Sequence, residues 1–332
     1  MSFAKYKKLI EEGDTVILYL SFNNLIPITV TSGQTHQNKY GALKHSDMIG
    51  VAYGSKINLK KGYVYVLHPT SELWTQTVPH RTQILYTTDI SMILTQLDLR
   101  PGSIVVESGT GSGSLSHSLI KAVMPTGHLH TFEFHKERAE QAAEEFKSHG
   151  LADYVTANHR DVCGDGFQLD QVADAVFLDL PSPWECIASA KQALKKEGGR
   201  LCNFSPCIEQ VQKACEALSQ HGFKDLTTLE CLLRNFNVRT VKLPLADLGQ
   251  SGLETPDPAE CVPTKVKISK VDNSMDKESD VKGQVAGPWK KVPKCDLIGK
   301  ITEKDFVFQT GAPPSQHPGH TGFLTFATLY PS

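Results

Sequence analysis

From residue 81 onward, short apolar runs alternate with longer stretches in which apolar residues recur every three or four positions. The first spacing is typical of buried strands and the second of amphipathic helices. Strands are expected over residues 103–106, 127–134, 154–158, 173–180 and 200–204, and helices over 114–124, 136–149, 185–196 and 207–221. A further helix is expected to begin with Thr88 or Asp89 as its N-cap. The alternation predicts an α/β fold with a parallel sheet wrapped by helices.

The first 70 residues carry a different pattern, in which short β-rich runs are separated by turn residues. Runs at residues 14–20, 25–30 and 62–67 are expected to be strands, with a polar stretch between the second and the third. Residues 69–79 are expected to be a connector. We therefore predict a small β-barrel or sandwich over residues 1–75, ahead of a nucleotide-binding domain over residues 76–245.

Residues 246–317 interrupt the alternation. They are rich in Pro, Gly, Asp, Ser and Lys and have few periodic apolar positions, which predicts a disordered, lysine-rich insertion. Residues 226–232 and 237–243 are expected to be further strands before it. A final strand over residues 322–328 follows it, so residues 318–332 are assigned to the same sheet as the nucleotide-binding domain.

Three glycines follow the strand at 103–106, at positions 109, 111 and 113, directly before a helix. A strand, a glycine turn and a helix N-terminus let the backbone approach a nucleotide-like ligand closely. The dinucleotide fingerprint Gly-x-Gly-x-x-Gly places its third glycine one residue later, where this chain has Ser114. A tight turn without a ligand is the alternative to a nucleoside site at this point.

Carboxylates follow several of the expected strands, namely Glu107, Glu133, Asp161 and Asp179. Ligands of open α/β sheets bind outside the carboxyl ends of the strands. Glu133 lies where a carboxylate would bind ribose hydroxyls. Asp161 and Val162 lie where an adenine ring would be recognised, although Asp161 could equally cap a helix or form a turn. The pattern favours a nucleoside ligand at this edge of the sheet.

Asp179 is followed by Leu-Pro-Ser-Pro-Trp184. Methyltransferases that act on the exocyclic amines of bases usually carry Asn/Asp-Pro-Pro-Tyr/Phe/Trp here, and this chain departs from that pattern at Leu180 and Ser182. Two prolines fix the backbone without offering N–H donors, so the Asp179 carboxylate is expected on a rigid edge. A rigid loop with Trp184 simply buried is the alternative.

Composition narrows the classes of function. Apolar residues make up 40% and charged residues 21% of the 332 positions, which is typical of a soluble globular chain. No apolar run of about twenty residues exists, so no membrane span is expected, and the N-terminus lacks a secretory signal. The eight cysteines form no Cys-x-x-Cys pair and are expected to be reduced thiols. The net charge of −2 excludes a uniformly basic surface, and the lysines of residues 1–80 and 265–304 suit either a local RNA-binding face or a solvated surface.

Five segments together resemble the catalytic subunit of the eukaryotic tRNA (adenine-58-N1) methyltransferases. They are residues 81–86, 107–113, 179–184, 204–209 and 320–324. The likeness covers residues 1–245 and 318–328. It implies a class I methyltransferase (Rossmann-like) fold with a seven-stranded sheet behind a small N-terminal β domain. It also implies S-adenosylmethionine as the cofactor, tRNA as the substrate, a non-catalytic paralogous subunit in a heterotetramer, and action in the nucleus, with neither a metal nor a membrane.

The same resemblance assigns site residues by matching motif. It implies that the cofactor is bound by Leu85, Glu107, Gly109, Gly111, Ser112, Gly113, Ser114, Glu133, Arg138, Asp161, Val162 and Asp179. It implies that the substrate is bound by Leu20, Ser21, Phe22, Gln34, Thr35, His36, Gln37, Asn38, Lys39, Tyr40, Gly41, Gly62, Tyr63, Gln83, Ile84, Thr87, Ser108, Leu180, Asn203, Phe204 and Ser205. Asp179 and Tyr86 are the catalytic candidates.

The implied reaction suits these residue types. Adenine N1 already carries a lone pair in the plane of the base, so methyl transfer needs orientation more than a strong base. Asp179 could accept a hydrogen bond from N6–H and stabilise the positive charge on the ring, and Tyr86 could stack on a flipped-out base. The alternatives are a nicotinamide dehydrogenase, an inactive binding subunit, methylation of another RNA, and methylation of protein carboxyl groups. The early third glycine argues against a dehydrogenase, and the set of carboxylates argues against an inactive binding subunit. The N-terminal β domain argues against methylation of protein carboxyl groups.

Overall fold

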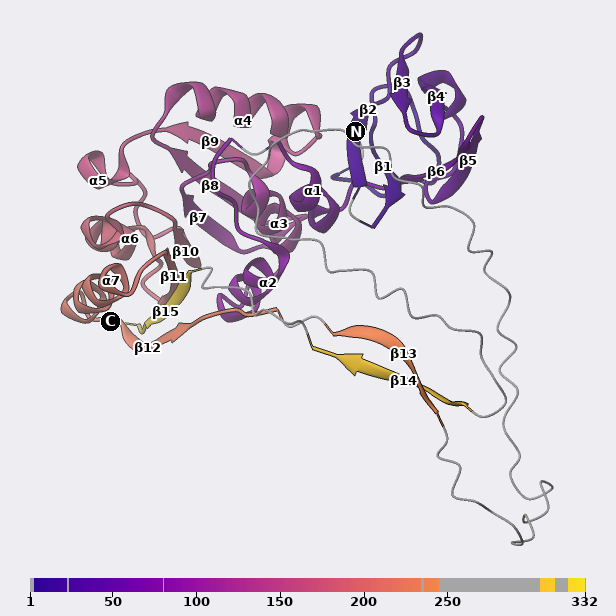
Figure 1. Ribbon diagram of the computed structural model, residues 1–332. Coiled ribbons are helices and arrows are strands. Elements are labelled where there is room, and N and C mark those ends of the chain that lie inside the picture. Colours follow the sequence, from indigo (N-terminus) through magenta and orange to yellow (C-terminus); the bar gives the residue numbers. More distant parts are fainter. Residues whose placement is uncertain are drawn as a thin grey trace, which may run out of the picture. The chain divides into compact units, whose positions relative to one another are not determined.

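The structure is a computed structural model that describes residues 3–22, 24–79, 81–233, 236–244, 305–313 and 322–331 (Figure 1). The chain divides into two compact units, residues 1–233 with 317–332, and residues 234–316. Within the described ranges, no helix is long and apolar enough to span a membrane. Most of the predicted insertion lies outside the described residues.

The first unit is built around a seven-stranded sheet with the order β12–β15–β11–β10–β7–β8–β9. Its strands are β7 (Ile104–Ser108), β8 (His128–Glu133), β9 (Val155–His159), β10 (Ala175–Leu178), β11 (Gly199–Ser205), β12 (Lys224–Leu229) and β15 (Phe323–Leu329). The strands from β9 to β11 are parallel neighbours, whereas β15 is antiparallel to both β11 and β12. The predicted seven-stranded sheet and the return of the chain after the insertion are confirmed.

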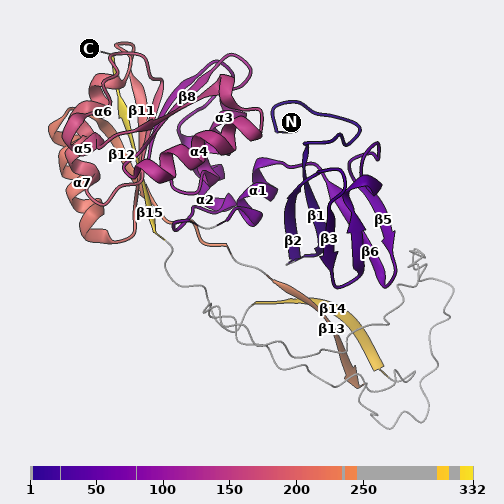
Figure 2. The same cartoon turned by 90° about the horizontal axis from the view of Figure 1, so that it is seen from above.

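Helices cover both faces of this sheet (Figures 1 and 2). Alternate residues of the central strands point to opposite faces, so Val105 and Phe177 pack with α2 (Thr87–Gln96), α3 (Ser114–Val123) and α4 (Lys136–Ser148). Val106 and Val176 pack on the other side with α5 (Val162–Asp165), α6 (Ile187–Ala193) and α7 (Ile208–Gln220). Burial on both faces explains why these strands are continuous apolar runs in the sequence.

The neighbouring strands β7 and β10 mark the point where the chain order reverses. The chain continues from β7 outward through β8 and β9, and from β10 outward in the other direction to β11. The backbone N–H of Asp179 donates to the carbonyl oxygen of Ser108 at 2.9 Å, so the ends of the two strands are joined. Ligands of open α/β sheets bind at such a reversal point, outside the carboxyl ends of the strands.

The N-terminal residues form a four-stranded antiparallel sheet and a separate hairpin. The sheet has the order β2–β1–β6–β5 and the hairpin is β3–β4. The strands are β1 (Thr15–Ser21), β2 (Asn24–Thr29), β3 (Thr35–Asn38), β4 (Gly41–Lys44), β5 (Ser55–Leu59) and β6 (Gly62–Leu67). Buried residues of both, such as Val16, Leu43 and Val64, share one small core. The predicted β-rich character of these residues is confirmed, although β3, β4 and β5 were not individually predicted.

Three helical predictions were wrong in detail. The expected connector contains α1 (Ser71–Thr77), which is capped by the Thr70 hydroxyl and buries Trp74. Helix α2 begins at Thr87 with Tyr86 as its N-cap, because Asp89 lies in the first turn of the helix rather than before it. The helix expected over 185–196 is a short 3-10 turn, Pro183–Cys186, followed by α6, which ends at Ala193 because Leu194 is extended.

The second unit contains a two-stranded antiparallel ribbon, β13 (Asn237–Pro244) with β14 (Asp305–Ala312). Strand β13 therefore does not join the seven-stranded sheet. Strand β14 falls inside the stretch predicted to be disordered, so that prediction was wrong for residues 305–312. The alternation of Phe306 and Phe308 with smaller residues was a strand signal, which the polar composition of the surrounding stretch outweighed.

Candidate active site

The turn after β7 brings the backbone of three glycines against neighbouring segments. Gly109 has φ +96°, and a Cβ there would lie 2.3 Å from the carbonyl oxygen of Asp179. Gly111 has φ +54°, and its Cβ would lie 2.6 Å from Oγ1 of Thr82. Gly113 has φ +74° and is the N-cap of α3. These conformations and close approaches require glycine, so the spacing read from the sequence reflects backbone geometry.

A pocket of about 870 Å³ opens above this turn, at the carboxyl ends of the parallel strands. Many of the residues predicted for cofactor or substrate line it: Gln83, Ile84, Leu85, Tyr86, Glu107, Ser108, Gly109, Gly111, Ser112, Ser114, Glu133, Arg138, Asp161, Val162, Asp179, Leu180 and Phe204. They come from segments spread over more than 120 residues of chain, which the fold brings together at one edge of the sheet. Such a pocket is large enough for a nucleoside cofactor and part of a second ligand.

Glu133 is held at the end of β8 by four donors. Its Oε1 accepts from the His135 N–H at 3.1 Å and from Nε and Nη2 of Arg138 at 3.0 and 2.6 Å. Its Oε2 accepts from the Gly111 N–H at 3.0 Å. Burial raises the pKa of Glu133, but these hydrogen bonds outweigh it and hold the pKa below its usual value. The carboxylate is therefore charged, and Oε2 keeps an acceptor position for a ligand hydroxyl.

Two further carboxyl groups line the pocket, the buried Glu107 and the partly buried Asp179. Glu107 is 1% exposed and accepts a hydrogen bond of 2.7 Å from Ser116 Oγ. Burial raises its pKa to about 7. Burial also raises the pKa of Asp179, to about 6. Within the described part of the chain, the Asp179 carboxylate accepts no hydrogen bond from the protein, so it is available to accept one from a ligand.

Residues 81–86 lie next to the glycine turn and are held there by hydrogen bonds to two serines. Ser112 Oγ accepts from the backbone N–H groups of Arg81 and Thr82 at 2.9 and 3.2 Å. Ser114 Oγ donates to the carbonyl oxygen of Leu85 at 3.1 Å. The two serines predicted to bind cofactor thus line the pocket and also position the segment that carries Leu85 and Tyr86.

Asp161 combines the two roles that the sequence left open. Its side chain accepts from the Cys163 N–H at 3.1 Å and caps α5, and the residue also lines the pocket beside Val162. The cap fixes the carboxylate at the end of β9, where it and the buried Val162 form one wall.

Other predicted residues lie away from the pocket. Gly113 and Thr87 do not line it. Asn203 and Ser205 are buried within β11, where Asn203 Nδ2 donates to Ser205 Oγ at 2.8 Å, and neither lines the pocket. Alternate residues of a strand point to opposite faces, so only Phe204 between them lines it.

The predicted substrate residues of the N-terminal domain form a separate group outside the pocket. Tyr40 OH donates to the Leu20 carbonyl oxygen at 3.3 Å, and the Tyr40 ring lies against Gly62, where a Cβ would be only 2.5 Å from the ring. Phe22 is 83% exposed, and Lys56 Nζ lies 3.8 Å from the centre of the half-exposed Tyr63 ring. Leu20 itself is buried in the domain core. The contacts of Tyr40 therefore join three of the predicted segments, around residues 20, 40 and 62.

Sequence reasoning missed about a dozen lining residues: Thr82, Asp89, Thr110, Leu115, Phe134, His135, Arg160, Cys163, Phe177, Pro181, Ser182 and Glu185. Most of them are neighbours in sequence of a predicted residue, so their place beside a strand end could have predicted that they line the pocket. Asp89 had none, because it lies within a helix whose start was misplaced.

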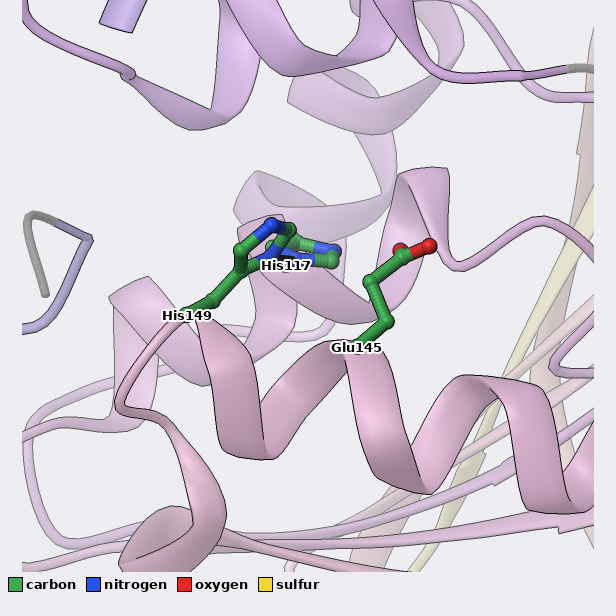
Figure 3. Close-up of side chains that lie close together, drawn as sticks. All are labelled: His117, Glu145 and His149. Atoms are coloured by element: carbon green, nitrogen blue, oxygen red, sulfur yellow. Dashed lines mark hydrogen bonds between the residues drawn. The ribbon is translucent and has the colours of Figure 1, made fainter. Parts of the chain in front are cut away.

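One cluster has the composition of a metal site (Figure 3). Ligand atoms of His117, Glu145 and His149 lie within 4.8 Å of one another. The imidazoles are already used, because His117 Nδ1 donates to the Gly113 carbonyl at 2.6 Å and its Nε2 accepts from His149 Nδ1 at 2.8 Å. Arg81 Nη2 lies 3.2 Å from Glu145 Oε2 and opposes a second cation. Burial lowers the pKa of His117 to about 4 and that of His149 to about 3, so both rings are neutral supports of the glycine turn.

Sequence comparison shows which known proteins this chain is similar to. A family model described as "tRNA methyltransferase complex GCD14 subunit" matches residues 62–329. The chain is 40% identical to the tRNA (adenine(58)-N(1))-methyltransferase catalytic subunit of Dictyostelium discoideum, over 98% of each chain. It is 39% identical to the corresponding subunit of Cryptococcus neoformans, over 97% of this chain and 82% of the relative.

Solved structures show the fold. A SAM-dependent O-methyltransferase of Thermotoga maritima has a TM-score of 0.69 at 23% identity, covering 98% of this chain and 96% of its own. A tRNA (m1A58) methyltransferase of Aquifex aeolicus has a TM-score of 0.63 at 22% identity, covering 98% and 100%. The architecture is that of the class I methyltransferases.

Proposed function

This chain belongs to the family of tRNA methyltransferase complex GCD14 subunits, and from that premise we propose that it transfers a methyl group from S-adenosylmethionine to N1 of adenine 58 in the T-loop of tRNA. One observation carries the proposal. Asp179 lies beside the glycine turn at the reversal point of the sheet and lines the pocket, which is also lined by a half-exposed aromatic residue, Tyr86.

The residues around the glycine turn suit S-adenosylmethionine. Glu133 Oε2 would accept from a ribose hydroxyl, and Asp161 with Val162 would hold the adenine ring. Glu107 and Asp179 offer negative charge close to where a positively charged ligand would lie. When bound, the cofactor supplies a methyl group activated by the sulfonium charge. The protein contributes position and electrostatic stabilisation.

The acceptor base would enter over the Tyr86 side of the pocket. Because N1 carries its lone pair in the ring plane, the protein must align N1 with the methyl carbon, and orientation of this kind supplies much of a rate enhancement. Asp179 would accept from N6–H and stabilise the charge that the ring gains. The ring of Tyr86, 49% exposed, would stack on a base flipped out of the tRNA.

The test is methyl transfer to an unmodified tRNA transcript and to the same transcript with guanine at position 58. We expect one methyl group per tRNA, located at adenine 58 by nuclease digestion and mass spectrometry, and none on the guanine variant. Methylation of both transcripts alike, or of a protein carboxyl group instead, would contradict the proposal. The assay is run with and without the co-purified partner subunit.

We further propose that the chain acts in a heterotetramer with a related non-catalytic subunit. The description of its family as a complex subunit supports a partner. The ribbon β13–β14 supports it as well, because a two-stranded ribbon is marginally stable alone and its residues Val238 and Phe306 are 72% and 56% exposed. Action in the nucleus stays a prediction of the sequence, which microscopy of the tagged chain would check.

A further inference from the structure

We infer that His117 is a positioning residue for S-adenosylmethionine, acting through the carbonyl group of Gly113 in the glycine turn. The inference rests on the proposed function, because that cofactor is the ligand whose place it concerns. His117 is 2% exposed, belongs to α3 and does not line the main pocket. Its role follows from the hydrogen bonds that its ring makes.

The Gly113 carbonyl oxygen is held by two donors of His117. Ring Nδ1 donates to it at 2.6 Å and the backbone N–H at 3.3 Å, so the ring supplies the shorter bond. Gly113 has left-handed dihedral angles, φ +74° and ψ +14°, which are not those of the helix that follows. The imidazole therefore fixes a carbonyl group that regular helix geometry alone does not align.

The tautomer of each histidine follows from these contacts. A carbonyl oxygen only accepts, so Nδ1 of His117 carries the proton, and burial lowers the pKa of His117 to about 4, which leaves Nε2 as an acceptor. His149 Nδ1 lies 2.8 Å from that nitrogen and donates to it (Figure 3). The His149 ring stacks on Phe3, with centroids 4.1 Å apart, and meets the edge of Trp74 at 4.7 Å. Both ring nitrogens of His117 are thus paired in a single orientation.

Fixing the Gly113 carbonyl also fixes the N–H of the next residue. The peptide between Gly113 and Ser114 is trans, so its C=O and N–H point in opposite directions. His117 takes up the carbonyl, and the Ser114 N–H is turned to the other side, at the start of α3 where Ser114 lines the pocket. Helix N-termini attract negative charge, and the methionine part of the cofactor carries a carboxylate. Misplacement of this peptide should therefore weaken cofactor binding.

The experiment compares His117→Asn with His117→Gln in the full chain with its partner. The amide of Asn lies as far along the side chain as Nδ1, so it keeps the donor to Gly113 and leaves His149 without an acceptor. The amide of Gln lies as far as Nε2, so it keeps the contact with His149 and loses the bond to Gly113. By titration calorimetry, we expect His117→Gln to raise the Kd for S-adenosylmethionine by about 5- to 10-fold, the cost of one hydrogen bond, and His117→Asn to change it by less than about twofold.

The melting temperature without ligand separates positioning from a purely structural role. His117→Asn should lower it more than His117→Gln, because the buried donor on His149 is left unpaired. Affinity and melting temperature then fall in opposite orders for the two variants. His117→Gln binding the cofactor as tightly as His117→Asn would overturn the inference. His221→Gln is the matched control and should leave the Kd unchanged, because His221 Nδ1 makes the same kind of bond, to the Ala217 carbonyl at 2.9 Å, outside the pocket.

The outcomes keep the inference apart from the proposed function. If the unaltered protein binds S-adenosylmethionine but does not methylate tRNA, the proposed function fails, and the affinities of the variants still decide the inference. If it methylates tRNA and His117→Gln binds the cofactor as tightly as the unaltered protein, the inference fails alone. Should a variant not fold, NMR of the histidine ring nitrogens in the unaltered protein decides instead. The proton of His117 is expected on Nδ1, and a proton on Nε2 would overturn the inference.

Discussion

The Asp179 side chain is the residue on which the proposed chemistry depends most. It is partly buried beside the glycine turn and, among the described residues, its carboxylate accepts no hydrogen bond from the protein. We expect Asp179→Ala to lower single-turnover methylation by about 10²- to 10³-fold, the usual cost of removing one electrostatic stabiliser of a transition state. Asp179→Asn keeps the shape without the charge and should lose a similar factor. Rates within a few-fold of the unaltered protein would assign the residue a structural role.

Ionisation of Glu107 and Asp179 predicts a pH dependence of cofactor affinity. The pKa of Glu107 is about 7 and that of Asp179 about 6, so both groups are neutral at pH 5 and charged at pH 8. S-Adenosylmethionine carries a sulfonium charge, and its affinity should rise with pH across this range, on the order of tenfold. S-Adenosylhomocysteine lacks that charge and is the matched control. Equal pH slopes for the two ligands, measured by titration calorimetry, would contradict the prediction.

Among single residues, those at strand ends were predicted better than those whose role depends on a contact with a distant part of the chain. Glu133 and Asp179 were found because carboxyl ends of parallel strands always meet at one edge. The tie between Ser112 and residues 81–82 spans 30 positions of chain, and no local pattern encodes it. The burial of Asn203 depends on which face of β11 turns inward, which the apolar run around it does not specify.

At the scale of elements, the turn between β7 and α3 depends on Gly109. Substitution by alanine would place a methyl group 2.3 Å from a backbone oxygen, which has no freedom to move. Gly50 is the matched control, because it also has positive φ, +78°, but nothing lies within 4 Å of its Cβ position. Gly50→Ala should cost only the left-handed strain of about 1–2 kcal/mol.

Gly109→Ala should therefore lower the free energy of unfolding by clearly more than Gly50→Ala, and should weaken cofactor binding as well. Urea denaturation measures the first effect and calorimetry the second. Equal losses for the two variants would show that the turn can relax, and that close approach is not what selects glycine at position 109.

The same scale explains which elements the sequence predicted. Strands β7 and β10 are buried on both faces and stand out as apolar runs, β8 stands out by alternation, and α3, α4 and α7 carry a clear apolar stripe. Helix α1 has only seven residues between two prolines, too short for a periodic pattern. Strand β14 is largely solvent-exposed, so its alternation was weak against a polar background.

At the scale of the whole molecule, the chain is proposed to work with a partner, and the ribbon β13–β14 offers the surface for it. Val241, Leu243, Phe306 and Phe308 lie on one face, because Val241 pairs with Phe308 and Leu243 with Phe306. Leu243 and Phe306 are 49% and 56% exposed. An apolar face of this kind on a two-stranded ribbon indicates a protein contact, since the ribbon gains stability when the face is covered.

We predict that the double variant Leu243→Lys/Phe306→Glu loses association with the co-expressed partner subunit. The new charges are opposite and directly paired across the strands, which favours the ribbon itself, whereas burying them in an apolar interface is costly. Ile208→Glu, at a 47% exposed apolar residue of α7, is the control and should associate normally. Light scattering of the co-purified material gives the assembly mass. A double variant that assembles like the unaltered chain would place the partner contact elsewhere, and tRNA methylation by the isolated double variant would show that the partner is not needed for the chemical step.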